Sequence, residues 1–182
     1  MCYTSELHLT TVFKGATHLK TRTSWPWFGS IVSTLFPFFV LSTPISAATI
    51  FSDLPAEPLI VKVDSDFMKQ AVLNIVLNGV QAMPQGGQLD IVARREDHVV
   101  VTEISDQGDG IPAEVQEKIF ELYFTTKKGG SGIGLAQTYQ ILQWHYGSVE
   151  FDTAPGKGTT FRLRIPLAET SLDDLKEMTA KS

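Results

Sequence analysis

Four polar side chains recur at regular intervals in an otherwise apolar segment. Between residues 66 and 83, Gln70, Asn74, Asn78 and Gln81 follow one another at spacings of four, four and three residues. These spacings place all four on one face of a helix. Amide oxygens are suitable ligands where a Mg²⁺ ion shared with anionic phosphates needs one more oxygen. A solvent-exposed face is the alternative, although such a face usually carries Lys and Glu.

A second candidate group stands where an apolar strand pattern gives way to a loop. Asp106 follows the Val- and Ile-rich segment 99–105 and precedes Gly108 and Gly110. A carboxylate at this point can accept a hydrogen bond from the amino group of adenine, whereas guanine presents an oxygen there. A hydrogen bond to a charged group contributes about 1.5–3 kcal/mol, enough to select the base. An ordinary Asx turn would be the better explanation if Asp106 stood alone.

A third group combines basic residues, glycines and the start of a helix. Residues 125–136 contain Lys127 and Lys128, followed by glycines at positions 129, 130, 132 and 134. Exposed N–H groups at a helix N-terminus bind phosphate, and glycine lets the backbone lie against it and move as a lid. The segment fits neither GxGxxG after a strand nor GxxxxGK[ST], which disfavours a dinucleotide-binding fold and a Walker-type NTPase.

The elements that must position these groups mix strands and helices without regular alternation. The predicted strands are 59–63, 89–94, 99–105, 148–153 and 159–166, and the predicted helices are 66–83, 113–120 and 133–145. Asp64 or Ser65 is expected to cap the helix that begins at residue 66. This order predicts an α+β fold with helices on one face of a mainly antiparallel sheet.

Composition bounds the class of protein. The 182 residues are 43% hydrophobic and 19% charged, which suits one globular domain with extensions. A net charge of -5 gives no basic surface for nucleic acid. The single cysteine, Cys2, cannot form an internal disulfide, and the sequence has no Cys/His cluster with zinc-ligand spacing.

Five segments, in order, resemble the motifs of the catalytic ATP-binding domain of sensor histidine kinases, in the GHKL superfamily of gyrase, a heat-shock chaperone and mismatch-repair ATPases. They are 74–78 (asparagine box), 106–110 (first glycine box), 119–127 (phenylalanine box and start of the ATP lid), 130–135 (second glycine box) and 156–161 (closing box). The resemblance extends over about residues 57–167 and is nearest to nitrogen-regulation kinases, which share the turn at 81–84. It implies a two-layer α/β sandwich of the Bergerat type.

The resemblance also implies a site for ATP and Mg²⁺ between the asparagine helix and the lid. Asn78 would be the metal ligand, Asn74 would lie in the phosphate region, Asp106 would recognise adenine, and Lys127 would face the phosphates. Asn74, Asn78 and Lys127 are thereby implied in catalysis. The other residues implied at the nucleotide are Gly108, Gly110, Ile111, Phe120, Thr126, Gly130, Gly132, Ile133, Gly134, Leu135 and Thr160.

One position separates two chemistries within the superfamily. In gyrase-like ATPases, the residue one turn before the metal-binding asparagine is a glutamate that activates water. Asn74 occupies that position here and cannot act as a general base, so phosphoryl transfer is favoured over hydrolysis.

None of the four histidines (8, 18, 98 and 145) is followed by the acidic residue and proline of the family's histidine box. We therefore expect surface or structural roles for them and a phosphoacceptor histidine on a domain missing from this chain.

The functional hypothesis is therefore the catalytic domain of a two-component sensor histidine kinase, with a histidine-bearing dimerisation domain and a response regulator as partners. A serine kinase of the anti-sigma-factor type and a non-catalytic ATP-binding regulatory module are the alternatives. We expect three regions: an apolar N-terminal arm (1–55), the catalytic domain (56–167) and a polar tail (168–182).

Residues 1–55 are the part of the sequence that fits this hypothesis least. The stretch 28–51 is apolar enough to be a membrane-span candidate, but Pro37 and Pro44 interrupt it. The basic residues that precede it would keep the N-terminus in the cytoplasm and export the rest, and a signal peptide would export it too. An anchor of atypical topology, an N-terminal arm and a misplaced start of the chain all stay open. The ATP-binding domain itself is expected in the cytoplasm, with membrane association through 28–51 left open.

Overall fold

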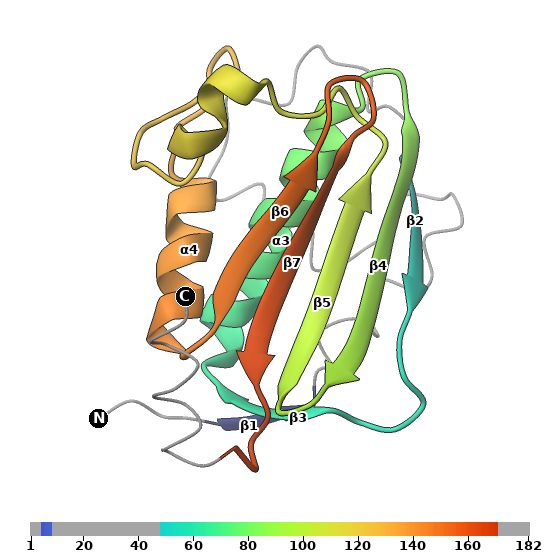
Figure 1. Ribbon diagram of the computed structural model, residues 1–182, viewed down its shortest axis with the longest axis vertical. Helices are drawn as coiled ribbons and strands as arrows, with labels where there is room; N and C mark the ends of the chain where they lie inside the picture. The colour runs from blue at the N-terminus through green and yellow to red at the C-terminus, as the bar shows by residue number, and fades with distance from the viewer. Residues whose placement is uncertain (1–4, 9–47, 171–182) are drawn as a thin grey trace, which may run out of the picture.

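A five-stranded sheet is the centre of this computed structural model, which describes residues 5–8 and 48–170 (Figure 1). The strands follow the order β2-β4-β5-β7-β6. Their bounds are Ala48–Asp53 (β2), Gly87–Glu96 (β4), Val99–Asp106 (β5), Ser148–Thr153 (β6) and Thr159–Pro166 (β7). β2 is parallel to β4, and the other neighbours are antiparallel. The mixed, mainly antiparallel sheet expected from the sequence is confirmed.

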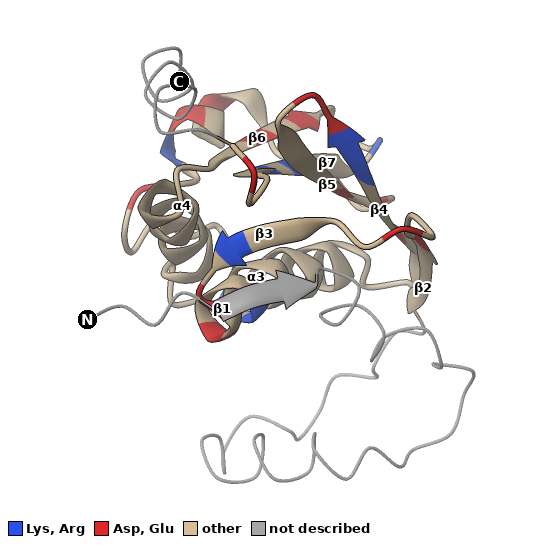
Figure 2. Ribbon diagram, turned by 90° about the horizontal axis from the view of Figure 1, so that it is seen from below, with Lys and Arg blue, Asp and Glu red and all other residues tan. Residues whose placement is uncertain are grey.

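Two long helices cover one face of this sheet. They are α3 (Ser65–Ala82) and α4 (Gly134–Trp144), and both lie on the same side in the view from below (Figure 2). The Asp64 carboxylate caps α3 by accepting hydrogen bonds from the N–H groups of Asp66 and Phe67. The segment expected as a helix at 113–120 forms a 3₁₀ helix, η1 (Ala113–Lys118). The two-layer α/β arrangement is therefore confirmed.

The core lies between the helices and the sheet. Apolar side chains from both layers are almost completely buried there: Met68 and Ile75 from α3, Ile141 and Leu142 from α4, and Leu89, Ile104 and Leu163 from the strands. Each such side chain contributes about 1.5–3 kcal/mol of hydrophobic stabilisation. The alternating pattern of the strands places the next residues of β4, β5 and β7 on the opposite face, which carries arginines and glutamates.

His145 joins the two helices at the end of the molecule where α3 begins and α4 ends. Its Nε2 accepts a hydrogen bond from the backbone N–H of Asp64 at 2.9 Å, and its Nδ1 lies 2.6 Å from the carbonyl oxygen of Ile141. Both contacts require the neutral ring with its proton on Nδ1. The structure thus gives His145 a structural role. His98 lies in the turn between β4 and β5, and His18 lies outside the described residues.

The chain before residue 56 contributes strands as well. β1 (Ser5–His8) pairs antiparallel with β3 (Ile60–Val63) in a small second sheet, and β2 is an edge strand of the main sheet. The sheet therefore includes residues from before position 56, where we expected the domain to begin. Of the membrane-span candidate 28–51, residues 48–51 belong to β2 and the rest lies outside the described residues. Within the described ranges, no helix combines the length and apolarity that a membrane crossing requires.

Candidate functional site

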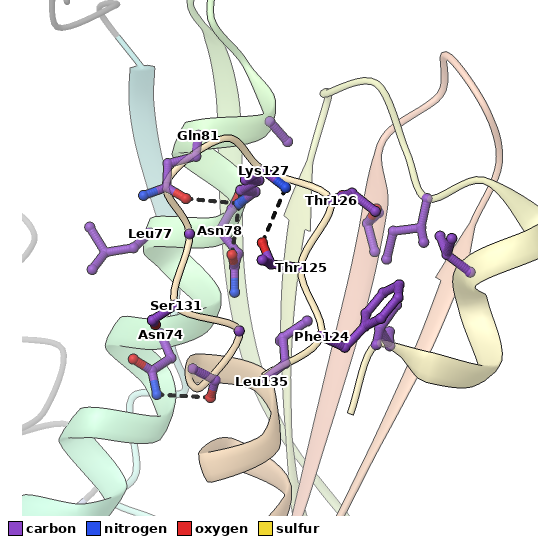
Figure 3. Close-up of a pocket in the computed structure, with 18 of the residues that line it drawn as sticks. Asn74, Leu77, Asn78, Gln81, Phe124, Thr125, Thr126, Lys127, Ser131 and Leu135 are labelled. Carbon is purple, nitrogen blue, oxygen red and sulfur yellow. Dashed lines mark hydrogen bonds between the residues drawn. The ribbon is translucent and has the colours of Figure 1, made fainter. Parts of the chain in front are cut away.

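A cavity of about 460 Å³ opens between α3, the loop that follows β5, and the lid loop, which we define as residues 124–132 (Figure 3). Eleven of the residues implied by the sequence line it: Asn74, Asn78, Asp106, Gly110, Ile111, Thr126, Lys127, Gly130, Gly132, Gly134 and Leu135. The amide-bearing helix, the acidic group after β5 and the glycine-rich basic loop thus converge on one space.

Four residues implied by the resemblance do not line the cavity. Phe120 packs against the rings of Tyr139 and Phe151, with ring centroids 5.7 and 5.9 Å away. The hydroxyl of Thr160 lies 2.8 Å from that of Ser105, and Ile133 is at the N-cap of α4. Strand alternation explains Thr160, because its neighbours Thr159 and Phe161 are the residues of β7 that face the cavity.

Gly108 is the fourth of these residues, and it supports the site from behind. Its N–H donates a hydrogen bond to Oδ1 of Asp106 at 2.8 Å. A Cβ at this position would lie 2.6 Å from the Cβ of Ala82, at the end of α3. Glycine is therefore required here for the loop to pack against the helix.

Asp106 lines the cavity, and one of its carboxylate oxygens is held by the backbone. Its Oδ1 accepts hydrogen bonds from the N–H groups of Gly108 and Thr159, at 2.8 and 3.2 Å. Oδ2 accepts no hydrogen bond from the described residues. Burial raises the pKa of Asp106, while the two N–H donors and the charge of Lys127 oppose that increase. The fixed orientation leaves Oδ2 available to accept a hydrogen bond from a ligand.

Gly79 allows α3 to approach Asp106. A Cβ at Gly79 would lie 2.8 Å from Cδ1 of Leu89 and 3.2 Å from the Cβ of Asp106. A side chain at position 79 would therefore require the buried Leu89 side chain and Asp106 to shift, and glycine lets the helix lie against the sheet without that shift.

Lys127 extends from the lid loop to the last turns of α3. Its Nζ donates hydrogen bonds to Oδ1 of Asn78 at 2.7 Å and to Oε1 of Gln81 at 2.8 Å (Figure 3). The residue as a whole is exposed, but its ammonium group is enclosed by these contacts. This burial lowers the pKa of Lys127, and the negative charge of Asp106 opposes the decrease. Amide oxygens thus gather around one cationic group at the position where the sequence predicts a metal ligand.

Asn74 lies one turn earlier and is directed to α4. Its Nδ2 donates a hydrogen bond to the carbonyl oxygen of Gly134 at 3.0 Å (Figure 3). The hydroxyl of Thr138 donates to the same carbonyl at 2.9 Å. α4 begins at Gly134 and has no side-chain hydrogen bond at its N-cap, so its first N–H groups stay available to an anion beside the cavity.

The polar stripe of α3 is therefore divided between two neighbours. Gln70 and Asn74 contact α4, because Nε2 of Gln70 donates to Oε1 of Gln137 at 2.9 Å. Asn78 and Gln81 contact the lid loop. A plain solvent-exposed face would not make these contacts, so that alternative does not account for the stripe.

Twelve residues that the sequence analysis did not assign to the site also line the cavity. They are Leu77, Gln81, Ala82, Pro112, Val115, Ile119, Phe124, Thr125, Gly129, Ser131, Thr159 and Phe161. Gln81 could have been found, because it shares the helical spacing of Asn74 and Asn78. Most of the others are apolar residues whose types also suit a core, so the sequence gives no signal that separates them from it.

Comparison with known proteins adds independent findings. The family model described as histidine kinase-, DNA gyrase B- and HSP90-like ATPase matches residues 63–169. Sporulation kinase A of Bacillus subtilis (strain 168) is 39% identical over 103 residues, which are 57% of this chain and 17% of that protein. Sensor histidine kinase ZraS of Escherichia coli (strain K12) is 37% identical over 113 residues, or 62% of this chain and 24% of that protein. The chain thus spans about a quarter or less of the length of these relatives.

The fold has close counterparts among solved structures. The nucleotide-free catalytic domain of histidine kinase ThkA superposes with a TM-score of 0.67 at 24% identity, covering 91% of this chain and 96% of that one. Full-length ShkA in complex with AMPPNP gives a TM-score of 0.69 at 18% identity, covering 94% of this chain and 32% of that one. At these identities the likeness establishes the arrangement of helices and strands alone.

Proposed function

Because the chain belongs to the histidine kinase-, DNA gyrase B- and HSP90-like ATPase family, we propose that it carries the ATP-binding catalytic domain of a sensor histidine kinase. The observation that carries the proposal is the convergence of Asn78, Asp106, Lys127 and the N-terminus of α4 on one cavity. The names of the relatives favour this function over an anti-sigma-type serine kinase and over a non-catalytic module.

Asp106 is proposed to select adenine. Its Oδ2 would accept a hydrogen bond from the exocyclic amino group, while Oδ1 stays bonded to the backbone of Gly108 and Thr159. Guanine would place a carbonyl oxygen against the same carboxylate, which is repulsive. The apolar side chains of Ile111 and Phe161 line the same cavity and can contact the base.

The phosphates are proposed to lie between the N-terminus of α4 and Lys127. The free N–H groups at the start of α4 and its helix dipole favour an anion at this position. The glycines at positions 130 and 132 line the cavity and allow the backbone to approach the phosphates. The lysine ammonium supplies a positive charge from the lid loop.

Asn78 is proposed as the protein ligand of Mg²⁺, and the donor set fits. Its Oδ1 already accepts a hydrogen bond from an ammonium group at 2.7 Å, so the oxygen is oriented for a cation. A Mg²⁺ ion bound there would neutralise charge on the phosphates during transfer. Because the amide of Asn74 cannot remove a proton from water, transfer to another acceptor is favoured over hydrolysis.

The acceptor is proposed to be a histidine on another domain. His145, the residue that follows α4, is separated from the cavity by the 11 residues of that helix, a rise of about 16 Å. Both of its ring nitrogens are engaged. A histidine-bearing dimerisation domain and a response regulator would then be the partners. Action on the cytoplasmic side, and membrane association through residues 28–51, stay predictions.

The first test measures nucleotide binding by calorimetry with and without Mg²⁺. Asn78→Ala is expected to abolish Mg²⁺-dependent ATP binding while the circular dichroism spectrum stays unchanged. Gln70→Ala is the matched control, because Gln70 lies on the same stripe but contacts Gln137 outside the cavity. Unchanged ATP affinity in Asn78→Ala would remove the metal-ligand assignment.

The second test measures transfer. The protein is incubated with labelled ATP and a separately supplied histidine-hairpin domain. Acid-labile label on histidine supports the proposal, whereas acid-stable label on a serine of a partner supports the serine-kinase alternative. Binding without transfer to any acceptor supports the regulatory module.

A further inference from the structure

Among the described residues, only neutral oxygens accept hydrogen bonds from the ammonium group of Lys127. Oδ1 of Asn78 and Oε1 of Gln81 accept its hydrogen bonds at 2.7 and 2.8 Å, and the backbone oxygen of Asn78 lies 3.5 Å away (Figure 3). None of the ion pairs in the described part of the chain includes Lys127. The carboxylate of Asp106 acts on it through space, without a hydrogen bond.

These contacts are the whole hydrogen-bonded connection between the lid loop and α3. All hydrogen bonds that join the two segments within the described ranges come from Nζ of Lys127. At its base, the loop is closed by a hydrogen bond from the N–H of Tyr123 to the carbonyl of Gly132 at 2.9 Å. Both residues have positive φ values, 68° and 66°. The loop is therefore fixed at its ends and held over the cavity by one side chain.

The position of the ammonium group conflicts with a metal ion at Asn78. A Mg²⁺ ion binds oxygen at about 2.0–2.1 Å, and the lysine nitrogen already lies 2.7 Å from the same oxygen. Two cations that share one neutral amide oxygen repel each other, and the phosphates that arrive with the metal ion offer the ammonium group an anionic partner instead. Binding of a metal ion at Asn78 therefore favours the departure of Lys127 from that oxygen.

We propose that Asn78 and Gln81 form a cation position that Lys127 occupies in the nucleotide-free protein, and that Mg²⁺ arriving with the nucleotide displaces Lys127 and releases the lid loop. Gln81 is then a positioning residue for Lys127. The metal part of this inference rests on the proposed function, whereas the hold on the lid loop rests on the contacts of Lys127 alone. Once displaced, the ammonium group is free to approach the phosphates.

The first measurement is amide hydrogen exchange of residues 124–132 without nucleotide or Mg²⁺. Gln81→Leu keeps the size of the side chain and removes the acceptor, so exchange of the lid loop is expected to be at least about fivefold faster than in the unmodified protein. Lys127→Met is expected to have a similar effect. The double variant is expected to be no faster than the faster single variant, because both changes remove the same contact.

Lys128→Met is the matched control. It removes the same charge from the neighbouring residue, which makes no side-chain hydrogen bond or ion pair with the residues that the structure describes. Lid exchange is therefore expected to stay unchanged. Equal exchange rates in Gln81→Leu and the unmodified protein would overturn the proposal.

The second measurement is the affinity for Mg²⁺-ATP. Gln81→Leu is expected to bind about twofold to tenfold more tightly, because less interaction must be broken before the metal enters. Weaker binding would show that Gln81 contributes to binding of the nucleotide, and equal binding would show that it has no effect on affinity. Either result would overturn the proposal. If the unmodified protein binds no Mg²⁺-ATP, the proposed function fails, while the exchange data still decide whether Gln81 holds Lys127.

Discussion

The side-chain amide of Asn74 donates a hydrogen bond to the carbonyl oxygen of Gly134 at 3.0 Å, which joins α3 to the first residue of α4. Thr138, whose side chain is completely buried, donates to the same carbonyl at 2.9 Å. Asn74, one turn before the proposed metal ligand Asn78, thus uses its side-chain amide to hold the N-terminus of α4 at the cavity. We expect a positional role for Asn74, which accords with transfer rather than hydrolysis.

Replacing Asn74 by aspartate is expected to break this junction. A carboxylate cannot donate to the Gly134 carbonyl and would face it with a negative charge, so Asn74→Asp should lower the free energy of unfolding by about 1–3 kcal/mol. It should also weaken ATP binding, because the start of α4 loses its anchor. Urea denaturation and calorimetry measure the two effects.

The control for this variant is Gln70→Glu, which makes the same amide-to-acid change on the same stripe. Gln70 is exposed, and it contacts the half-buried Gln137. Rotation of the Gln137 amide can present a donor to the new carboxylate, so the stability should change by less than about 0.5 kcal/mol. A stable Asn74→Asp protein that hydrolyses ATP would contradict the positional role.

Replacing Asp106 by asparagine is expected to separate stability from binding. The amide oxygen can still accept from the N–H groups of Gly108 and Thr159, while an NH₂ group replaces the free Oδ2 and opposes the adenine amino group. ATP affinity should fall at least about tenfold. The free energy of unfolding at pH 7 should be equal or higher, because a buried charge has been removed.

The pH dependence of this comparison has a definite sign. Burial raises the pKa of Asp106 above its ordinary value, which is about 4 for an unfolded chain. The folded protein therefore holds the proton more tightly, and its stability falls as the pH rises from the ordinary value through the raised one. The stability advantage of Asp106→Asn should thus be absent at low pH and appear as the pH rises. An advantage that shrinks with rising pH would contradict this account.

Replacing Gly79 by alanine is expected to be costly despite the higher helix propensity of alanine. The added Cβ would lie 2.8 Å from Cδ1 of Leu89 and 3.2 Å from Asp106. Overpacking of this kind should lower the free energy of unfolding by about 1–3 kcal/mol and move Asp106 out of position. Thermal denaturation and ATP binding should report both changes.

Gly134→Ala is the stability control for this substitution. Gly134 is also a helical glycine, but the nearest atom to an added Cβ there is Cγ of Asn74 at 3.5 Å, an ordinary contact. Its free energy of unfolding should equal that of the unmodified protein or exceed it by up to about 1 kcal/mol, because alanine is the better helix former. If both glycine variants are equally stable, close packing does not explain Gly79.

Glu103 lies on the face of the sheet opposite the helices, between two arginines. The hydrogen bonds from Arg94, together with that from Arg162, outweigh partial burial and lower the pKa of Glu103 to about 2. Its stabilisation is therefore fully present above the ordinary pKa and is lost as the pH falls towards 2. Glu103→Gln should lower the free energy of unfolding by about 1 kcal/mol at pH 7, after solvent screening is allowed for.

Urea denaturation at a series of pH values tests this prediction. The difference between Glu103→Gln and the unmodified protein should shrink as the pH is lowered from 5 to 3, because the carboxylate becomes protonated in the unfolded chain first. High salt should reduce the difference as well. A difference that is constant over this pH range would mean that the charge of Glu103 contributes nothing.

Local patterns in the sequence were enough to predict α3, α4 and four of the five strands of the main sheet. Periodicity, caps and turn residues act over a few neighbours, so they can be read without the fold. The sequence placed Asn74, Asn78 and Gln81 on one helical face and Asp106 at the end of a strand. The strand β2 was missed, because its apolar residues also suited a membrane-span candidate and its partner, β4, begins about forty residues later.

Only the tertiary structure decided how these pieces serve one cavity. Phe120 and Thr160 turn away from it, the amide stripe is shared between α4 and the lid loop, and Gln81 holds Lys127. These facts depend on contacts between residues that are 19 to 67 positions apart, from Phe120 with Tyr139 to Gln70 with Gln137. Helical spacing determines which side chains share a face, but the packing of the whole chain determines what that face meets.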